Sequence, residues 1–209
     1  MAFQLKDVTL QALKDCRIGM PHNVASIEIH SDGATSDGPA GWANILITYD
    51  STGQKWFSGY RVGLVVTDPM HSENIGADRP TAACAELSGI AWALKHAPQY
   101  AGTLGPVTIF YDCMYASDTA QALCVAKANG IIAKITSGLA LLLAQFGALH
   151  WIHEKGHHEL PWNEFADVAA KWACKQTFAY TVMATPCAQW LSAGNSYANW
   201  AFLLRPTDK

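Results

Sequence analysis

The chain has 209 residues, of which 50% are hydrophobic and 15% are charged. This length and composition suit one globular domain with some additional chain, and they exclude a long disordered polypeptide. The net charge of −3 and the pI of about 6.2 argue mildly against strong nucleic-acid binding by this chain alone, because nucleic-acid binders usually carry an excess of lysine and arginine.

The cysteines and the apolar segments bear on the cellular compartment. No CxxC pair occurs, and the first residues lack the continuous apolar stretch of a secretory signal. We therefore expect an intracellular protein with reduced, mostly buried thiols. No apolar run approaches the ~20 residues that span a bilayer, so no membrane segment is expected.

The first half of the chain predicts a β-meander. Residues 1–22 form a lead-in segment with room for a short amphipathic helix that ends by Pro21. Turn residues then separate three strands of an antiparallel meander, which are predicted over residues 24–31, 41–49 and 54–67. Residues 68–80 contain Pro, Gly, Asn and Asp without periodicity and predict a loop.

The second half alternates helices with strands. The predicted elements are a helix over 81–97 that Pro98 stops, a buried strand over 107–112, helices over 116–128 and 131–146 separated by Asn129-Gly130, a strand over 149–153, and a helix from Pro161 to about residue 178. Hairpin strands followed by βαβ units imply an α/β domain over residues 23–178. Its five-stranded mixed sheet has three antiparallel strands, then two parallel ones, with helices on both faces. Residues 179–209 form an apolar C-terminal tail.

Four acidic residues occupy telling places in this scheme. Asp32 ends the first strand and Asp112 the fourth, while Glu86 lies on the first long helix and Asp167 early in the last one. Strands one and four are natural neighbours, so Asp32 and Asp112 would lie side by side at the carboxyl edge, where ligand sites of open α/β sheets gather. Each acid alone is weak evidence, because an Asp before a Gly is usually a turn residue and a helical Glu is usually solvated.

Carboxylates held close together need a cation. They repel one another and raise one another's pKa unless something positive intervenes. Mg²⁺ prefers hard oxygen ligands. Two such ions about 3.5–4 Å apart can activate the attacking water and stabilise the leaving oxygen in phosphodiester cleavage. That chemistry needs several carboxylates from different elements at one place.

The most specific motif covers residues 156–167, with the sequence Gly-His-His-Glu-Leu-Pro-Trp-Asn-Glu-Phe-Ala-Asp. Together with residues 29–35, residues 85–87 and Asp112, it resembles the type 1 ribonuclease H family, which includes the ribonuclease H domains of retroelement reverse transcriptases. The family typically shows a Gly-His, a loop, an Asn-Glu, and an Asp four residues after the Asn, and this chain keeps that spacing. The resemblance covers about residues 24–178 and implies a ribonuclease H-like fold.

The resemblance also implies an activity. The family's members are endonucleases that hydrolyse the RNA strand of RNA–DNA hybrids and leave 5′-phosphomonoesters. By position in the motifs, Asp32, Glu86, Asp112 and Asp167 would hold two Mg²⁺ ions, for which Mn²⁺ would substitute. The implied partner is an RNA–DNA hybrid, with a reverse transcriptase or polymerase domain as a second partner.

Four further residues take roles from the same resemblance. His157 would lie on a mobile loop and assist proton transfer or product departure. Asn163 would fix that loop or touch the substrate, Thr81 would approach a DNA phosphate, and Gly33 would contribute to substrate binding. All four are therefore expected at the substrate face.

The chain departs from the family pattern at its substrate face. Ala82-Ala83 stands where a polar pair, often with Asn, usually reads the minor groove of the hybrid, and Cys113 stands where Ser is usual. The lysine-rich helix by which many members grip the hybrid is missing, and only Lys127 and Lys134 fall in that region. These gaps predict weak independent binding by a domain that works beside a larger partner, such as a retroelement polymerase.

Three classes of alternative remain open: another nuclease of this fold, a zinc-binding module and a non-catalytic domain. An integrase or transposase of this fold would end its triad in Glu rather than Asp167, and a proofreading-type exonuclease would show Asp-x-Glu where Ala34 stands. A zinc module would use histidines and a cysteine, namely His153, His157, His158 and Cys174. A degenerate domain would only tether a polymerase, although degenerate members tend to lose site acids.

Overall fold

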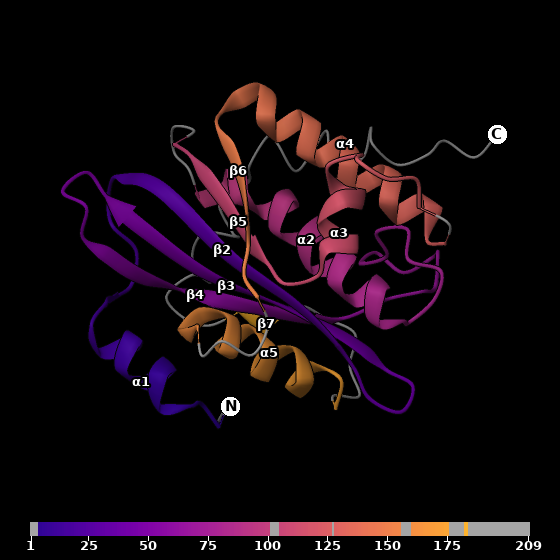
Figure 1. Ribbon diagram of the computed structural model, residues 1–209, viewed down its shortest axis with the longest axis horizontal. Helices are drawn as coiled ribbons and strands as arrows, with labels where there is room; N and C mark the ends of the chain where they lie inside the picture. The colour runs from indigo at the N-terminus through magenta and orange to yellow at the C-terminus, as the bar shows by residue number, and fades with distance from the viewer. Residues whose placement is uncertain (1–3, 101–104, 127, 156–159, 176–181, 184–209) are drawn as a thin grey trace.

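The computed structural model describes residues 4–100, 105–126, 128–155, 160–175 and 182–183 (Figure 1). One mixed sheet forms its centre, and the five predicted strands are all present. The strands are β1 (Arg17–Ile18), β2 (Val24–Thr35), β3 (Ala40–Asp50), β4 (Lys55–Leu64), β5 (Val107–Tyr111), β6 (Leu149–His153) and β7 (Val182–Met183).

The order of the strands is β1-β4-β3-β2-β5-β6. Antiparallel pairing joins β2 to β3 and β3 to β4, whereas β5 pairs parallel with both β2 and β6. The meander followed by two parallel strands is therefore confirmed. Two short strands, which were not predicted, extend the sheet: β1 pairs parallel with β4, and β7 pairs antiparallel with β4. Both have only two residues, too few to show a period in the sequence.

Helices cover both faces of the sheet, as expected (Figure 1). They are α1 (Asp7–Lys14), α2 (Ala82–Tyr100), α3 (Met114–Ala120), α4 (Gly130–Phe146) and α5 (Pro161–Ala173). Helices α2, α3 and α4 lie together on one face, while α5 packs on β2, β3 and β4 from the other side and carries α1. None of these described helices is both long and apolar enough to cross a membrane.

The two faces of the sheet build two apolar clusters, because successive strand side chains point to opposite sides. On the α2 side, Ile29 and Trp42 are almost fully buried, and the Trp42 ring stacks on Trp92 with centroids 5.4 Å apart. On the α5 side, Phe57 stacks on Trp162 at 6.0 Å. The sheet is thus a rigid central layer from which functional side chains can project.

Several predicted boundaries were wrong: β4 ends at Leu64 rather than at residue 67, and α5 ends at Ala173 rather than near residue 178. Strand β2 continues past residue 31 to Thr35, because its pairing with β3 continues after β5 has ended. Helix α2 passes through Pro98 to Tyr100, where the missing N–H of proline costs only a bond in the last turn. Helix α3 ends at Ala120 rather than near residue 128, because Ala122 adopts a left-handed conformation (φ 57°) that no composition signal announces.

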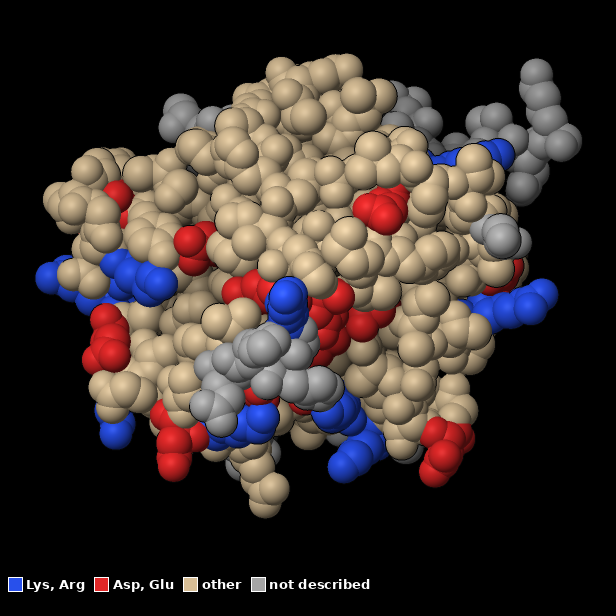
Figure 2. Space-filling view, viewed as in Figure 1, with Lys and Arg blue, Asp and Glu red and all other residues tan. Residues whose placement is uncertain are grey.

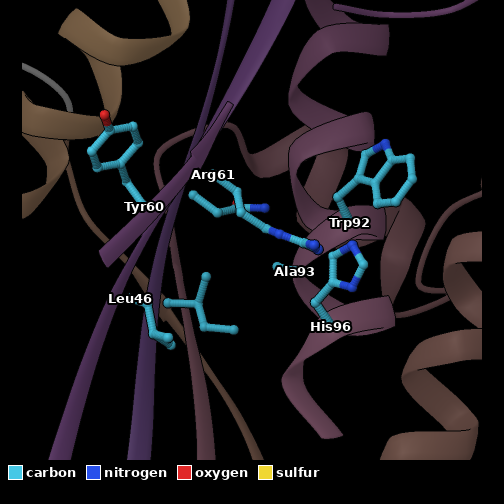
Figure 3. Close-up of a pocket in the computed structure, with 8 residues that line it drawn as sticks. Leu46, Tyr60, Arg61, Trp92, Ala93 and His96 are labelled. Carbon is cyan, nitrogen blue, oxygen red and sulfur yellow. The ribbon is translucent and has the colours of Figure 1, made fainter. Parts of the chain in front are cut away.

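A small cavity of about 10 Å³, lined by both apolar and polar side chains, lies between the sheet and α2 (Figure 3). Arg61 from β4 points toward His96 and Trp92 of α2, while Tyr60 points to the opposite side. Both ring nitrogens of His96 are buried without a hydrogen-bond partner in the described part of the chain. The volume suits a single water-sized occupant, so the cavity is too small for an organic substrate or cofactor.

Candidate metal centre

The parallel register of β2 and β5 brings two carboxylates together. The last pair of this ladder is Ser31 with Tyr111. Asp32 follows within β2, and Asp112 follows directly after the end of β5. Asp32 lies inside β2 rather than at its end, but it follows the last residue that β5 pairs. The predicted neighbourhood of Asp32 and Asp112 is therefore confirmed, at the carboxyl edge of the parallel strands.

A close approach of α2 to β2 adds Glu86. A Cβ atom at Gly33 would lie 2.2 Å from the backbone nitrogen of Glu86 and 2.5 Å from the carbonyl carbon of Ala85. A Cβ at Gly89 would likewise lie 2.5 Å from Ser31 Oγ. Two glycines, one on each element, thus let the helix lie directly on the strand. The family resemblance assigned Gly33 to substrate binding, and this packing role was not predicted from the sequence.

The three carboxyl groups form one compact cluster. Asp32, Glu86 and Asp112 each offer an oxygen atom, and these atoms lie within 4.8 Å of one another. Asp32 is only 5% exposed, and its Oδ1 accepts a 2.7 Å hydrogen bond from the backbone N–H of Gly33. Within the residues that the structure describes, this is the one group of three or more potential metal ligands. Such a set of carboxylate oxygens fits a hard divalent cation.

The electrostatics of the cluster point the same way. Burial, then the charges of Asp112 and Asp167, raise the pKa of Asp32 to about 7. Burial, then the charges of Asp32 and Asp112, raise the pKa of Glu86 well above its ordinary range. Buried carboxylates that repel one another are stabilised either by protons or by a cation. The site is therefore built to take up positive charge.

Asp167 lies near this cluster without belonging to it. It projects from α5, and its charge helps to raise the pKa of Asp32. Its side chain is 31% exposed, and Oδ1 lies 2.7 Å from Lys171 Nζ one turn further along the helix. Without a cation, the lysine one turn away supplies the compensating charge. The structure thus brings the fourth predicted acid to the edge of the cluster.

The remaining predicted residues have different surroundings. Thr81 is exposed and caps α2, because its Oγ1 accepts a 3.2 Å hydrogen bond from the N–H of Cys84. Asn163 is 6% exposed in the first turn of α5. His157 falls within residues 156–159 and lies outside the described residues, as does His158.

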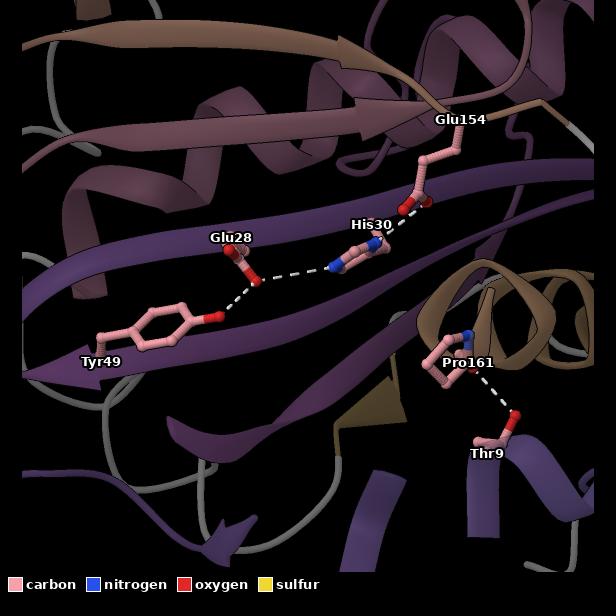
Figure 4. A network of polar contacts seen from close by, with 6 residues as sticks. All are labelled: Thr9, Glu28, His30, Tyr49, Glu154 and Pro161. Atoms are coloured by element: carbon pink, nitrogen blue, oxygen red, sulfur yellow. Dashed lines mark hydrogen bonds and ion pairs between the residues drawn. The ribbon is translucent and has the colours of Figure 1, made fainter. Parts of the chain in front are cut away.

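Sequence reasoning missed His30, and it considered His153 only as a zinc ligand. His153 Nε2 lies 3.2 Å from the backbone carbonyl oxygen of Asp112 and can donate to it. His30, two residues before Asp32, is almost fully buried, and its Nδ1 lies 3.1 Å from Glu154 Oε2 (Figure 4). Strand alternation places His30 and Asp32 on one face, which was the available signal; the partner of His30 could not be read from the sequence.

The zinc interpretation loses two of its four residues. His153 lies beside Asp112 at the end of β6, whereas Cys174 Sγ is buried and donates to the carbonyl oxygen of Ala34 at 3.2 Å. These residues belong to no common ligand group among the described residues. The five cysteines in the described part of the chain are free thiols.

The surface charge of the face drawn in Figure 2 is mixed. Figure 2 shows acidic side chains gathered near the middle of this face, with Lys and Arg side chains mostly toward its lower part and margins. The upper part of the same face is nearly without charge. No broad basic surface is visible in this view, which agrees with the net charge of −3.

The strand order and the three carboxylates at the carboxyl ends of the central parallel strands are those of ribonuclease H-like α/β domains. The chain therefore belongs to this fold class. The family model described as RNase H matches residues 24–175, and the chain belongs to this family. The match ends where α5 has just finished, so it includes every member of the carboxylate cluster and Asp167.

Solved structures share the fold. The N-terminal RNase H domain of Rv2228c from Mycobacterium tuberculosis is 17% identical, with a TM-score of 0.51 over 72% of this chain and 94% of that one. RNase H1 from Halobacterium salinarum is 17% identical, with a TM-score of 0.50 over 71% and 96%. LC9-RNase H1, a type 1 enzyme with the type 2 active-site motif, is 16% identical, with a TM-score of 0.54 over 86% of each chain. No curated protein matches the sequence.

Proposed function

We propose that this chain is a ribonuclease H, an endonuclease that hydrolyses the RNA strand of RNA–DNA hybrids and leaves 5′-phosphate ends. The observation that carries the proposal is the cluster of Asp32, Glu86 and Asp112 at the carboxyl edge of the sheet, in a chain of the RNase H family. Phosphodiester hydrolysis at neutral pH needs charge stabilisation and an activated water, and such a cluster can recruit both through metal ions.

The residues present fit a divalent cation. The carboxyl groups are buried or half-buried, and their mutual repulsion raises the pKa values of Asp32 and Glu86. In our proposal Asp32, Glu86 and Asp112 hold Mg²⁺ or Mn²⁺, and Asp167 exchanges Lys171 for a second ion. When bound, the metal supplies an activated water and stabilises the charge that develops on the scissile phosphate.

The protein's own groups would position the substrate around this cluster. The Gly33 N–H donates a hydrogen bond to Asp32 Oδ1 and so restricts the orientation of that carboxylate. Thr81, exposed at the start of α2, is proposed to approach a DNA phosphate, since helix N-termini favour anions. Asn163 is proposed to order the loop that follows β6, and His157 on that loop to move a proton or to assist product departure.

Recognition of the hybrid is proposed to rest on backbone shape and on the RNA 2′-hydroxyl groups, with little base readout. Grooves close to A-form favour this mode. The exposed Ala82 and half-buried Ala83 at the start of α2 offer no polar side chain to a base. Cleavage is therefore expected across hybrids of many sequences, and cutting of one sequence alone would contradict this mode of recognition.

The charge of the chain favours a partner that supplies affinity. With a net charge of −3, the domain offers few phosphate contacts. We propose that it acts beside a reverse transcriptase or polymerase, as part of a retroelement polyprotein. The same net charge would also suit a non-catalytic domain that only packs on a polymerase. The retained carboxylate cluster favours a catalytic domain instead.

A cleavage panel tests the proposal. The protein is incubated with Mg²⁺, or separately with Mn²⁺, and end-labelled RNA–DNA hybrid, RNA–RNA and DNA–DNA duplexes of one sequence. We expect internal cuts in the RNA strand of the hybrid alone, with 5′-phosphate ends. Cleavage of the DNA strand would favour another nuclease of this fold, and no cleavage with either metal would favour the tether.

A further inference from the structure

Helix α1 precedes the family match, which begins at residue 24, yet it docks on the helix that carries Asp167. Thr9 is fully buried at this contact, and its Oγ1 donates a 2.9 Å hydrogen bond to the carbonyl oxygen of Pro161, the first residue of α5 (Figure 4). Apolar side chains of the lead-in segment, among them Leu13, pack against the same cluster as Trp162 and Phe165. The contact is therefore a built interface.

An ion pair that is buried on one side reinforces this contact. Glu164, in the first turn of α5, has a side chain only 6% exposed, and it pairs with Lys6 at the start of α1. The lysine side chain is 55% exposed, so the pair is buried on the glutamate side alone. Removing the lysine would leave the almost fully buried carboxylate of Glu164 without this counter-charge, which costs more than losing a pair that is exposed on both sides. Lys6 thus holds the first turn of α5 in place.

The other end of α5 has its own anchor on the sheet. A Cβ at Gly41 would lie 2.8 Å from Ala173 Cβ, and Cys174 Sγ donates to the carbonyl oxygen of Ala34. Asp167 lies between this anchor and the α1 contact. A rigid helix held at two points has a fixed tilt on the sheet, whereas a helix held at one end can pivot and move the side chains at its free half.

We propose that α1 is a positioning element for the metal centre: Lys6 and Thr9 fix the first half of α5, and so set the distance of Asp167 from the Asp32–Glu86–Asp112 cluster. This inference rests on the proposed role of Asp167 as a metal ligand. Lys6 and Thr9 are positioning residues, since their ion pair and hydrogen bond go to Glu164 and Pro161, which belong neither to the cluster nor to the residues assigned to the substrate.

The test uses the full chain with Lys6→Met and Thr9→Val, which remove the charge and the hydroxyl group while keeping most of the volume. Lys14→Met is the matched control, because Lys14 is an exposed lysine in the last turn of the same helix. Mn²⁺ affinity is measured by calorimetry without substrate, and the Mg²⁺ concentration for half-maximal cleavage is measured separately. Circular dichroism confirms that each variant is folded.

We expect Lys6→Met and Thr9→Val to weaken Mn²⁺ binding several-fold and to raise the required Mg²⁺ concentration by a similar factor, with Lys14→Met unchanged. Lys6→Arg and Thr9→Ser, which keep the charge and the hydroxyl group, should restore binding. In an Asp167→Asn background, Lys6→Met should have no further effect on metal affinity, because both changes act through one carboxylate.

Two results would overturn the proposal. One is a lowered melting temperature with unchanged metal affinity, which would make α1 a brace for stability alone. The other is an effect of Lys6→Met that persists in the Asp167→Asn background. If the wild type binds Mn²⁺ but cuts no hybrid, the proposed function fails, while the calorimetric comparison still decides the role of α1.

Discussion

The charges of single carboxyl groups give the metal-free protein a pH dependence that can be derived from their positions. Burial and mutual repulsion raise the pKa values of Asp32, to about 7, and of Glu86 in the folded chain. In the unfolded chain both return to about 4. The folded state therefore binds more protons than the unfolded state between these values, and folding stability must fall as pH rises through that window.

Urea unfolding in EDTA at pH 5 and pH 8 checks this prediction. We expect the free energy of unfolding to be higher at pH 5, and Glu86→Gln to reduce the difference by removing one of the repelling charges. Mg²⁺ should restore stability at pH 8, because a ligand of the folded state alone stabilises it by mass action. Equal stability at both pH values would mean that the cluster is not strained by its own charge.

The sequence predicted which acidic residues lie together better than it predicted the side chains around them. Strand order placed Asp32 beside Asp112, and the family resemblance added Glu86. The contacts of His30 with Glu154, 124 residues away, and of Thr9 with Pro161, 152 residues away, follow from packing and leave no local pattern. Long-range side-chain pairs of this kind could not be predicted from one sequence.

The approach of α2 to β2 is the feature of the elements on which the site depends most directly. Gly33→Ala should destabilise the protein by at least about 2 kcal/mol, because the new methyl group would meet the backbone of α2 rather than a movable side chain. It should also weaken metal binding by displacing Glu86. Gly130→Ala is the control, since a Cβ there meets nothing within 4 Å.

Chemical denaturation of both variants, followed by titration with Mn²⁺, makes the comparison. Equal stability of the two alanine variants would show that α2 can move away from the strand at little cost.

The order of the long helices and strands was predictable from periodicity. The ends of α3 and the strands β1 and β7 were not, because a left-handed alanine and two-residue pairings carry no periodic signal.

For the whole molecule, we expect weak substrate binding rather than slow catalysis to limit the activity. With a net charge of −3, the chain offers few lysine or arginine contacts to phosphates. We therefore predict a high KM, a kcat in the usual range of nucleases and a shallow dependence of KM on salt concentration. Fusion to a basic hybrid-binding module should lower KM and leave kcat nearly unchanged, which is the signature of uniform binding.

Steady-state cleavage of one hybrid at two salt concentrations, with and without the fusion, measures these quantities. Tight binding by the lone domain together with a steep salt dependence would show that its substrate face is far more basic than the charge of the chain indicates.

The C-terminal segment adds a prediction about assembly and stability. Trp190, Trp200 and Phe202 lie outside the described residues, and their apolar character predicts that they pack on the domain or on a neighbouring molecule. Removal of residues 184–209 should lower the melting temperature or abolish self-association. Removal of residues 179–209 should cost more, because it also deletes β7 from the edge of β4. Calorimetry and light scattering measure both effects, and no change in either would make the segment inert.

The central claim is that a metal held by the carboxylate cluster cuts the hybrid, and one comparison tests it most directly. Wild type and Asp112→Asn are assayed side by side on a labelled RNA–DNA hybrid with Mg²⁺, and unfolding of both is followed in EDTA. We predict cleavage by the wild type and none by the variant. The variant should be folded and at least as stable, because the substitution removes a repelling charge. Full activity of Asp112→Asn would contradict the account.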